Sequence, residues 1–278
     1  MFLSLSDVSS SNSQVPPVVL CDIDGVVWLA RRELPRASEA VAMLRSQGRR
    51  VVFVTNNSFA TKSEQESHLD EIGIPALGDV VTSAMAAASL VEPSTRVLVC
   101  GGPGLVEAVR DRNAHPVSMA EYDDDRAGIE AVVVGFHRKF DYEVLRRAHE
   151  AIRRGARFIA SNTDATYPTP NGPIPGGGSI VAAVTTATGV APHIAGKPHR
   201  TMATLVRSLV PGVSPSTVMI GDRLSTDGRF AQELGCRFGF VRSDVSADEI
   251  AAGNVETCDF DGPSLWSVVQ QVLASAEV

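Results

Sequence analysis

Two aspartates, Asp22 and Asp24, close an apolar segment near the start of the chain, in the sequence VVLCDIDGVVW. The apolar residues before them are typical of a buried strand. Their alternate spacing directs both carboxylates to about the same side of the chain. Two like charges at the edge of a hydrophobic core repel each other, so either one carboxyl stays protonated or a cation lies between them.

Other groups suited to a phosphate or a cation also follow apolar runs. They are Thr55, Asn56 and Asn57 after one run, and Asp222 and Asp227 after another. Taken singly, each of these groups is explained by a strand that ends in a solvated turn. Lys197, which stands between glycine and proline, is by itself explained as a charged loop residue in water. A calcium-binding loop is excluded, because Gly25 at the sixth loop position would put Leu20 and Arg31 where acids are needed.

The elements that must position these groups are short β-branched runs that alternate with helical patterns. The runs are VVLCD, RRVVFVTNNS, DVVTS, RVLVCGG, AVVVGF, RFIASNTD, STVMIGDRLSTD and CRFGFVRSD. Continuous apolar strands covered by helices on both faces predict a parallel α/β sheet. Ligands bind outside the carboxyl ends of strands in such a sheet, so groups far apart in sequence can converge there. The pattern predicts one polar site.

Three helices have clear boundaries in the sequence. Thr61 opens a capping-box pattern that leads toward Ile72, and Asp141 can cap a helix that ends before Gly155. A third helix is expected over SIVAAVTTATG, after the segment GPIPGGG and before Gly189. We find no internal repeat and no heptad pattern.

Composition narrows the class of protein. The chain has 278 residues, of which 44% are hydrophobic and 21% charged, and this favours a soluble globular protein of about two domains. The 25 lysines and arginines against 32 acidic residues give a net charge of −7, which argues against nucleic-acid binding. The four scattered cysteines suggest neither disulfides nor zinc, so we expect a cytoplasmic protein. No apolar run approaches the ~20 residues that span a bilayer.

Taken in order, the motifs resemble those of the haloacid-dehalogenase (HAD) superfamily of phosphohydrolases. The segments DIDGVVW, FVTNNS, GKP and GDRLSTD resemble its four motifs, and ASNTDATYP followed by PGGGS resembles the cap of its type II phosphatases. That group includes 4-nitrophenylphosphatase, phosphoglycolate phosphatase and glycerol-3-phosphate phosphatase. The resemblance implies an α/β fold with a Rossmann-like parallel-sheet core and an inserted α/β type II cap domain.

The resemblance also implies roles for the polar residues. Asp22 is expected to be the nucleophile that becomes an aspartyl phosphate, and Asp24 to protonate the departing alkoxide and later deprotonate the attacking water. Thr55 and Lys197 complete the expected catalytic set. The expected substrate- and phosphate-binding residues are Gly25, Asn56, Asn57 and Tyr167.

Magnesium is the cofactor implied by the resemblance. The Asp22 carboxylate, the Asp24 backbone carbonyl and Asp222 are expected to hold Mg²⁺ together with phosphate and water. Asp227 is expected to orient Lys197 or a metal-bound water. The positive charge beside the paired aspartates is then Mg²⁺ and Lys197.

The serine-rich composition of residues 1–17 predicts a flexible tail. The resemblance divides the rest of the chain into a hydrolase core over 18–92 and 190–278 and an inserted cap over 93–189. The expected partner is a small phosphorylated metabolite, with no nucleic acid and no membrane, and a homodimer is left open. A phosphomutase and a non-catalytic phospholigand-binding module are the alternatives to a phosphatase.

The segment from Asn162 to Pro175 is too rich in proline and glycine to continue a regular strand, so we expect a shaped loop that reaches over the site and selects the substrate. Within it, Tyr167 can pack its ring on a substrate, or else within the cap. Thr163 and the segment Arg242 to Val245 depart from the family pattern, and their effect is expected to fall on substrate fit.

Overall fold

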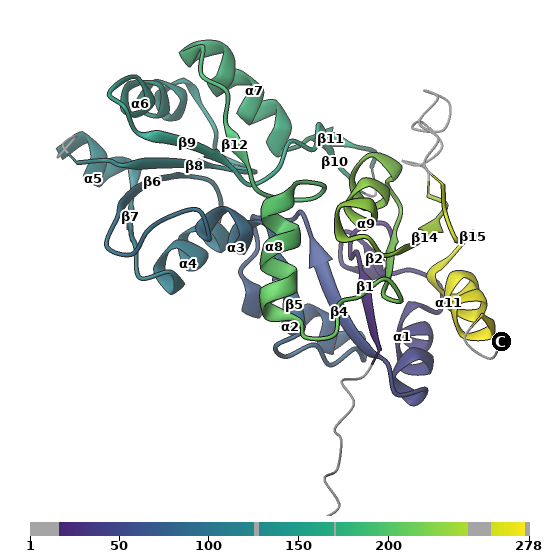
Figure 1. Cartoon of the computed structure of the whole chain (residues 1–278). Coiled ribbons are helices and arrows are strands. Elements are labelled where there is room, and N and C mark those ends of the chain that lie inside the picture. The colour runs from purple at the N-terminus through teal and green to yellow at the C-terminus, as the bar shows by residue number, and fades with distance from the viewer. Residues whose placement is uncertain (1–16, 125–127, 170, 244–256, 276–278) are drawn as a thin grey trace, which may run out of the picture.

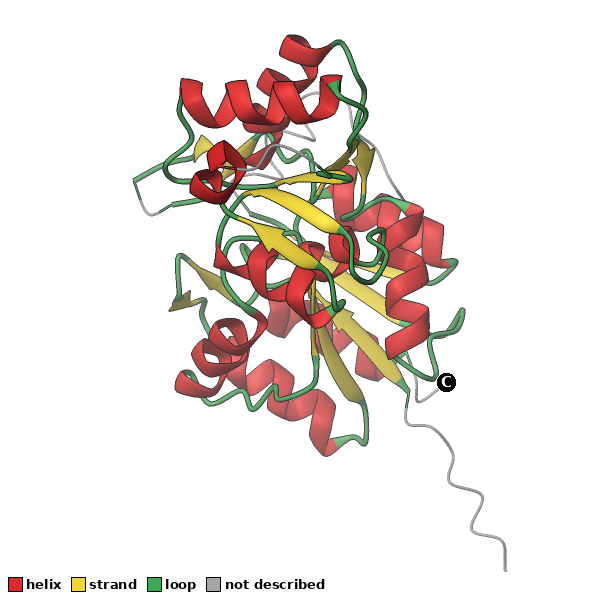
Figure 2. Ribbon diagram, turned by 90° about the vertical axis from the view of Figure 1, so that its left-hand side faces the viewer, coloured by secondary structure: helices red, strands yellow, loops and turns green. Residues whose placement is uncertain are grey.

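The computed structural model of the protein describes residues 17–124, 128–169, 171–243 and 257–275. Within these ranges, six strands form a parallel core sheet and five form the parallel sheet of an inserted cap. Helices cover both faces of each sheet, and the cap lies beyond one end of the core sheet (Figures 1 and 2). The expected α/β class with a second α/β unit inserted into a parallel-sheet core is confirmed.

The core sheet brings together strands from both ends of the chain. In spatial order it contains β15 (Phe260–Gly262), β14 (Arg237–Val241), β13 (Val218–Gly221), β1 (Val18–Cys21), β4 (Arg50–Thr55) and β5 (Val80–Thr82). At the centre, Cys21 pairs with Phe53 on one side and with Ile220 on the other. The carboxyl ends of β13, β1 and β4 therefore meet at one edge of the sheet, as the sequence predicts.

Alternate residues of the core strands enter two separate hydrophobic layers. Val19 and Cys21 pack with α1 (Ala37–Ser46), α2 (Lys62–Glu71) and α11 (Leu265–Ala274). Val18 and Leu20 pack on the opposite side with α3 (Ser83–Ala88), α8 (Arg200–Leu209) and α9 (Arg229–Leu234). Because both faces are buried, the strands carry the continuous apolar runs seen in the sequence.

The cap has a sheet and helices of its own. Its strands, in spatial order, are β12 (His193–Ile194), β9 (Arg157–Ala160), β8 (Ala131–Val134), β6 (Arg96–Cys100) and β7 (His115–Val117). One face packs on α4 (Pro103–Asp111), and the other on α5 (Met119–Asp124), α6 (Tyr142–Arg153) and α7 (Gly177–Thr188). β12 follows residue 189, where the cap was expected to end, yet it pairs with β9. We therefore propose that the cap extends through β12.

The segment from Asn162 to Pro175 contains a short antiparallel pair that the sequence reasoning did not specify. β10 (Thr166–Tyr167) and β11 (Ile174–Pro175) form this pair, and no longer strand runs through the described part of the segment. Proline is tolerated in this pair because a two-stranded ladder leaves one side of each strand unpaired. A similar short pair, β2 (Trp28–Leu29) and β3 (Arg32–Glu33), follows β1.

The helix boundaries agree with the sequence signals in most places. Thr61 makes both hydrogen bonds of a capping box with Glu64, and the Asp141 side chain accepts a hydrogen bond from the Val144 N–H at 2.8 Å. α7 begins at Gly177 rather than at Ser179. Its early turns lie so close to the segment before β10 that a Cβ at Gly178 would come within 2.3 Å of the Thr163 carbonyl oxygen.

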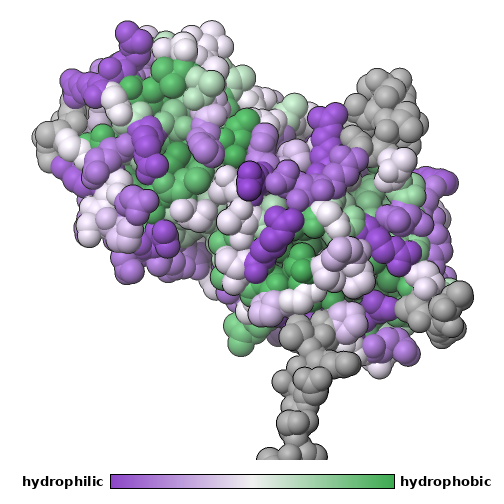
Figure 3. Space-filling model, in the orientation of Figure 1, coloured by the Kyte–Doolittle hydropathy of each residue, from purple (hydrophilic) through white to green (hydrophobic). Residues whose placement is uncertain are grey.

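The surface of the cap is unevenly charged. Residues 165–196, which include β10, β11, α7 and β12, contain no Asp, Glu, Lys or Arg. Hydrophobic side chains gather over the cap on the face shown in Figure 3.

No described helix combines the length and apolar character that crossing a bilayer requires. The expected tail lies, apart from Pro17, outside the described residues.

Candidate active site

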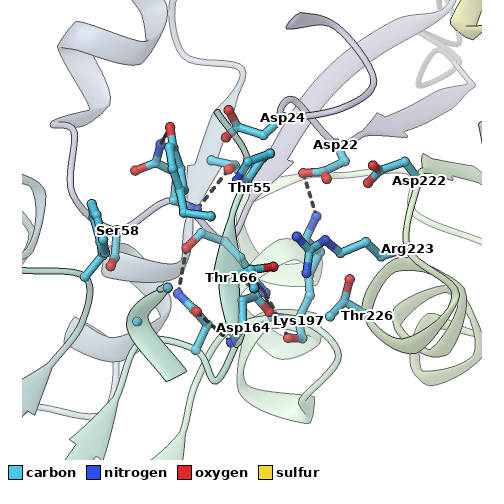
Figure 4. A pocket seen from close by; sticks show the side chains of 18 residues that line it. Asp22, Asp24, Thr55, Ser58, Asp164, Thr166, Lys197, Asp222, Arg223 and Thr226 are labelled. Atoms are coloured by element: carbon cyan, nitrogen blue, oxygen red, sulfur yellow. Dashed lines mark hydrogen bonds and ion pairs between the residues drawn. The ribbon is translucent and has the colours of Figure 1, made fainter. Parts of the chain in front are cut away.

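Asp22 and Lys197 lie on the floor of a pocket at the carboxyl edge of the core sheet (Figure 4). Asp227 is fully buried behind the pocket lining and contacts Lys197. Asp22 directly follows β1, and Asp227 lies in a single π-helical turn, Leu224–Gly228, after β13. The Lys197 Nζ lies 2.7 Å from Asp22 Oδ1 and 2.6 Å from Asp227 Oδ1. One ammonium therefore bridges two carboxylates from different strands.

Burial decides the electrostatics of this trio. Lys197 is 3% exposed and Asp227 is fully buried. Burial alone would lower the pKa of Lys197, but the two adjacent carboxylates outweigh it and raise that pKa well above its ordinary value. The Asp22 pKa is also raised by burial, against the opposing effect of Lys197. Lys197 therefore stays protonated at neutral pH.

Asp222 joins this floor and completes an acidic group suited to a metal ion. Among the described residues, one carboxylate oxygen from each of Asp22, Asp222 and Asp227 lies within 4.8 Å of the others. The Asp222 Oδ1 atom is buried and has no hydrogen-bond partner within the described part of the chain. Three buried carboxylates beside one lysine leave excess negative charge, which a hard divalent cation with oxygen ligands would balance. These residues fit the expected Mg²⁺.

Gly25 explains how the floor can be so compact. It has a φ of +87°, and a Cβ at this position would lie 2.2 Å from Asp222 Oδ2. A side chain here would displace the Asp222 carboxylate, and the left-handed backbone would be strained for most other residues. Gly25 therefore serves the site by its close approach to Asp222.

Asp24 lines the same pocket, as the alternate spacing predicts. Its Oδ1 accepts a hydrogen bond from the indole N–H of Trp28 at 3.1 Å. Burial raises the pKa of the Asp24 carboxyl, and hydrogen bonds from Trp28 and Asn57 partly oppose this. A carboxyl with a raised pKa holds a proton more readily, which suits a group that gives and takes protons.

Thr55 and Asn57 stand at the end of β4, beside Asp24. The Thr55 hydroxyl accepts a hydrogen bond from the Asn57 backbone N–H at 3.0 Å. Its own hydrogen has no acceptor among the described residues, so it is free to donate into the pocket. The Asn57 side-chain oxygen accepts hydrogen bonds from the backbone N–H groups of Phe59 and Ala60, which fixes the turn after the strand.

Asn56 has a different position from the one expected of a phosphate ligand. Its side-chain NH₂ donates to the Asp164 carboxylate at 3.1 and 3.2 Å and to the Lys197 carbonyl at 3.1 Å, while its Oδ1 accepts from the Lys197 N–H at 2.9 Å. The side chain is thus engaged in tying Lys197 to the cap. Only its backbone N–H is left for phosphate, which narrows the expected role of Asn56.

The cap supplies the opposite wall of the pocket. Tyr167 stacks on Phe136, with ring centroids 5.5 Å apart and planes 13° apart, and Phe136 meets Phe59 edge-on. The Asn57 amide lies 3.5 Å from the Tyr167 hydroxyl, and burial raises the pKa of that hydroxyl. Tyr167 therefore packs within the cap wall and also lines the pocket. Its contact with a substrate stays a prediction.

Comparison with known proteins identifies the family. A model described as haloacid dehalogenase-like hydrolase matches residues 19–115, and a second HAD-hydrolase-like model matches residues 194–266. The D-glycerol 3-phosphate phosphatase of Mycobacterium tuberculosis is 37% identical over 94% of this chain and 73% of its own length. The chain belongs to the haloacid dehalogenase-like hydrolases. It is a phosphatase of that family, which favours this class over the phosphomutase and the non-catalytic module.

A further relative of this HAD phosphatase and a solved structure cover most of the chain. The dihydroxyacetone phosphatase of Corynebacterium glutamicum is 33% identical over 82% of this chain and 82% of its own. The crystal structure of the glycerol phosphate phosphatase of Mycobacterium tuberculosis in complex with magnesium has a TM-score of 0.79 and 35% identity, over 92% of this chain and 77% of that one. The type II architecture expected from the sequence is thereby shown.

Several pocket residues of the HAD phosphatase escaped the sequence reasoning. They are Phe136, Arg223 and Thr226, whereas Asn162, Asp164 and Thr166 belong to the segment that was expected to reach over the site but were not named individually. Arg223 stands inside the fourth motif, directly after Asp222, and its charge between two acids was a signal that could have been used. Phe136 offers no such signal. Thr163, noted as a departure, is exposed, while its neighbours on both sides line the pocket.

Proposed function

We propose that this phosphatase hydrolyses phosphomonoesters of small hydroxylated metabolites, with Asp22 as nucleophile, Asp24 as acid and base, and Mg²⁺ as cofactor. The observation that supports it best is the pocket floor. There the Asp22 carboxylate is held by Lys197 at 2.7 Å and belongs to the acidic group with Asp222 and Asp227. A carboxylate held in this way presents a fixed oxygen to an incoming phosphorus atom.

The first half of the reaction transfers the phosphoryl group to the enzyme. A carboxylate oxygen of Asp22 forms a bond to phosphorus, and the bond from phosphorus to the ester oxygen breaks. The departing alkoxide takes a proton from Asp24 and leaves as an alcohol. Because Asp24 lies two residues from Asp22 and lines the same pocket, it can reach the leaving oxygen.

The second half returns the enzyme to its starting state. Asp24, now ionised, removes a proton from a water molecule as the water oxygen attacks phosphorus. The bond between phosphorus and the Asp22 oxygen breaks, which releases inorganic phosphate and restores the carboxylate. The raised pKa of Asp24 suits a group that must alternate between the two forms.

Phosphate oxygens need several donors during both steps. The Thr55 hydroxyl, the Asn56 backbone N–H and the Lys197 ammonium are donors that this pocket offers to the phosphate. Mg²⁺, held by Asp22, the Asp24 carbonyl and Asp222, supplies neutralisation of the phosphate charge when bound. Asp227 keeps Lys197 in place through its 2.6 Å contact.

The pocket and the relatives support the proposed substrate class. Phe136 and Tyr167 line the same pocket as Asp24, and Asp164, Thr166 and Arg223 there could make polar contacts to a short leaving group. Two relatives act, by their names, on phosphates of three-carbon alcohols or ketones. We therefore favour glycerol 3-phosphate or a compound of similar size. A cytoplasmic location stays a prediction of the sequence, which leaves a homodimer open.

The test is phosphate release by the purified enzyme from glycerol 3-phosphate, dihydroxyacetone phosphate, phosphoglycolate and an aryl phosphate, each with Mg²⁺ and with excess chelator. We expect Mg²⁺-dependent release, with the highest kcat/KM on a three-carbon phosphate. Asp22→Asn, prepared in parallel, controls for contaminating phosphatases. Full activity in excess chelator would contradict the proposed requirement for Mg²⁺. Phosphate release from the aryl phosphate alone would contradict the proposed substrate class.

A further inference from the structure

Ser243 contacts the acidic group from outside the pocket floor. It follows β14, the strand next to β13, and its hydroxyl donates a 2.7 Å hydrogen bond to Asp222 Oδ2. The residue before it is anchored, because the Arg242 N–H donates to the Gly262 carbonyl at 2.9 Å and its guanidinium pairs with Asp261. Ser243 therefore approaches Asp222 from a backbone that the sheet holds in place.

The two oxygens of Asp222 have different surroundings. Oδ2 is enclosed between the Ser243 hydroxyl and Gly25, where a Cβ would come within 2.2 Å. Oδ1 is buried and unpartnered within the described part of the chain. The hydrogen bond to one oxygen therefore sets the rotation of the whole carboxylate, and leaves the other oxygen available to a ligand.

We propose that Ser243 is a positioning residue for the magnesium site, which it serves by holding Asp222 in the orientation that Mg²⁺ requires. The proposal rests on the proposed function, since it takes Asp222 as a magnesium ligand. Mg²⁺ demands near-octahedral geometry with short bonds, so a ligand carboxylate that can rotate loses much of its value. Hydrogen-bond partners of metal ligands commonly have this effect.

This role also reinterprets a departure noted in the sequence. The segment from Arg242 to Val245 was expected to affect substrate fit. Ser243 instead touches a residue of the acidic group, and Arg242 pairs with Asp261 on the surface of the core. Asp244 and Val245 lie outside the described residues. A change at Ser243 should therefore alter metal affinity before it alters the choice of substrate.

The experiment compares metal binding by titration calorimetry in the wild-type protein and in Ser243→Ala, Ser243→Thr and Asp222→Ala. Ser208→Ala is the matched control. Ser208 is an exposed serine of α8, and within the described part of the chain its hydroxyl donates only to the Leu205 carbonyl of the same helix. We expect Ser243→Ala to raise the Kd for Mg²⁺ by about 10- to 100-fold. Ser243→Thr keeps the hydroxyl and should restore binding, and Ser208→Ala should match the wild type.

A second readout separates positioning from general loosening of the fold. Ca²⁺ accepts irregular coordination and longer bonds, whereas Mg²⁺ does not. Ser243→Ala should therefore lose Mg²⁺ affinity more than Ca²⁺ affinity, while the thermal unfolding midpoint in chelator stays near that of the wild type. Equal losses of affinity for Mg²⁺ and Ca²⁺ would overturn the positioning role of Ser243 and indicate a structural role.

Each remaining outcome is also decisive. Unchanged Mg²⁺ affinity in Ser243→Ala, with loss of binding in Asp222→Ala, overturns this proposal and leaves the proposed function intact. A wild-type protein that binds no Mg²⁺ overturns both. If Ser243→Ala does not fold, Ser243→Cys replaces it, because a thiol has nearly the same shape and is a weak donor. Weakened Mg²⁺ binding there supports the proposal, and wild-type binding overturns it.

Discussion

The Lys197 ammonium lies between Asp22 and Asp227, at 2.7 and 2.6 Å from one oxygen of each. It joins the carboxyl end of the central strand to the turn after β13, and its own backbone is held by Asn56 after β4. Three separate segments are thereby locked into one floor. The charges of this floor determine what each substitution should do.

Asp22→Asn should abolish turnover while the protein stays folded. The amide is nearly the same size and can still contact Lys197, but it cannot form an aspartyl phosphate, so we expect a loss of kcat of about 10³-fold or more. Phosphate release and the thermal unfolding midpoint, measured on one preparation, check both statements. Near-normal activity would rule out Asp22 as the nucleophile.

Asp24→Asn should slow the enzyme according to the leaving group. Alkyl phosphates need a proton on the departing oxygen, and positioned acid catalysis contributes about 10²- to 10⁴-fold. We expect a loss in that range for glycerol 3-phosphate and a smaller loss for an aryl phosphate, whose oxygen leaves as a stable anion. The ratio of kcat values for the two substrates is the measurement. Equal losses would mean that Asp24 is mainly structural.

Tyr167→Ala should change the choice between substrates. The ring stacks on Phe136 and lines the pocket, so its removal opens space beside the leaving group. Relative kcat/KM values across the substrate panel should shift, with the Mg²⁺ requirement unchanged. Tyr167→Phe separates the ring from the hydroxyl. A uniform factor for every substrate would indicate that Tyr167 only packs the cap.

Arg223→Gln should weaken binding of the substrate. Among the described residues, the Arg223 side chain makes no ion pair within 4.0 Å, although Asp164 and other carboxylates raise its pKa. A cation at the pocket without a close partner is available to substrate oxygens. We expect KM to rise by about tenfold, equivalent to about 1.4 kcal/mol, with a smaller change in kcat. Arg223→Lys tests whether charge alone is enough. A fall in kcat at constant KM would contradict a binding role.

Stability without metal should fall as pH rises. Burial and the neighbouring Asp227 raise the pKa of Asp222 to about 7, far above its value of about 3.9 in the unfolded chain. Between these two values the folded state holds more protons than the unfolded one, so the stabilising effect is complete at low pH and is lost as pH rises through the folded-state pKa.

The measurement is the thermal unfolding midpoint in chelator at about pH 5 and about pH 8, on either side of the Asp222 transition. The midpoint should be lower at the higher pH, and Mg²⁺ should raise it there. Asp222→Asn removes the titrating group, so its midpoint should depend less on pH. A midpoint that rises with pH in the metal-free wild type would contradict the raised pKa.

The sequence by itself determined the elements that carry the site. Apolar runs that end in Asp22, Thr55 and Asp222 predict parallel strands with polar carboxyl ends, because buried strands need apolar residues and only their ends meet water. Capping signals at Thr61 and Asp141 are local in sequence, which is why they were read correctly. The order of the four motifs along the chain indicated the family.

Only the tertiary structure decided which of these groups touch. Asn56 holds Asp164 across 108 residues of sequence, and Ser243 reaches Asp222 from the next strand. The hairpin of β10 and β11 forms in a segment whose prolines and glycines predicted a loop. Such contacts depend on strand register and on how the cap packs against the core. The sequence pattern of a single segment does not predict these contacts, because the two partners come together only when the strands and sheets assemble.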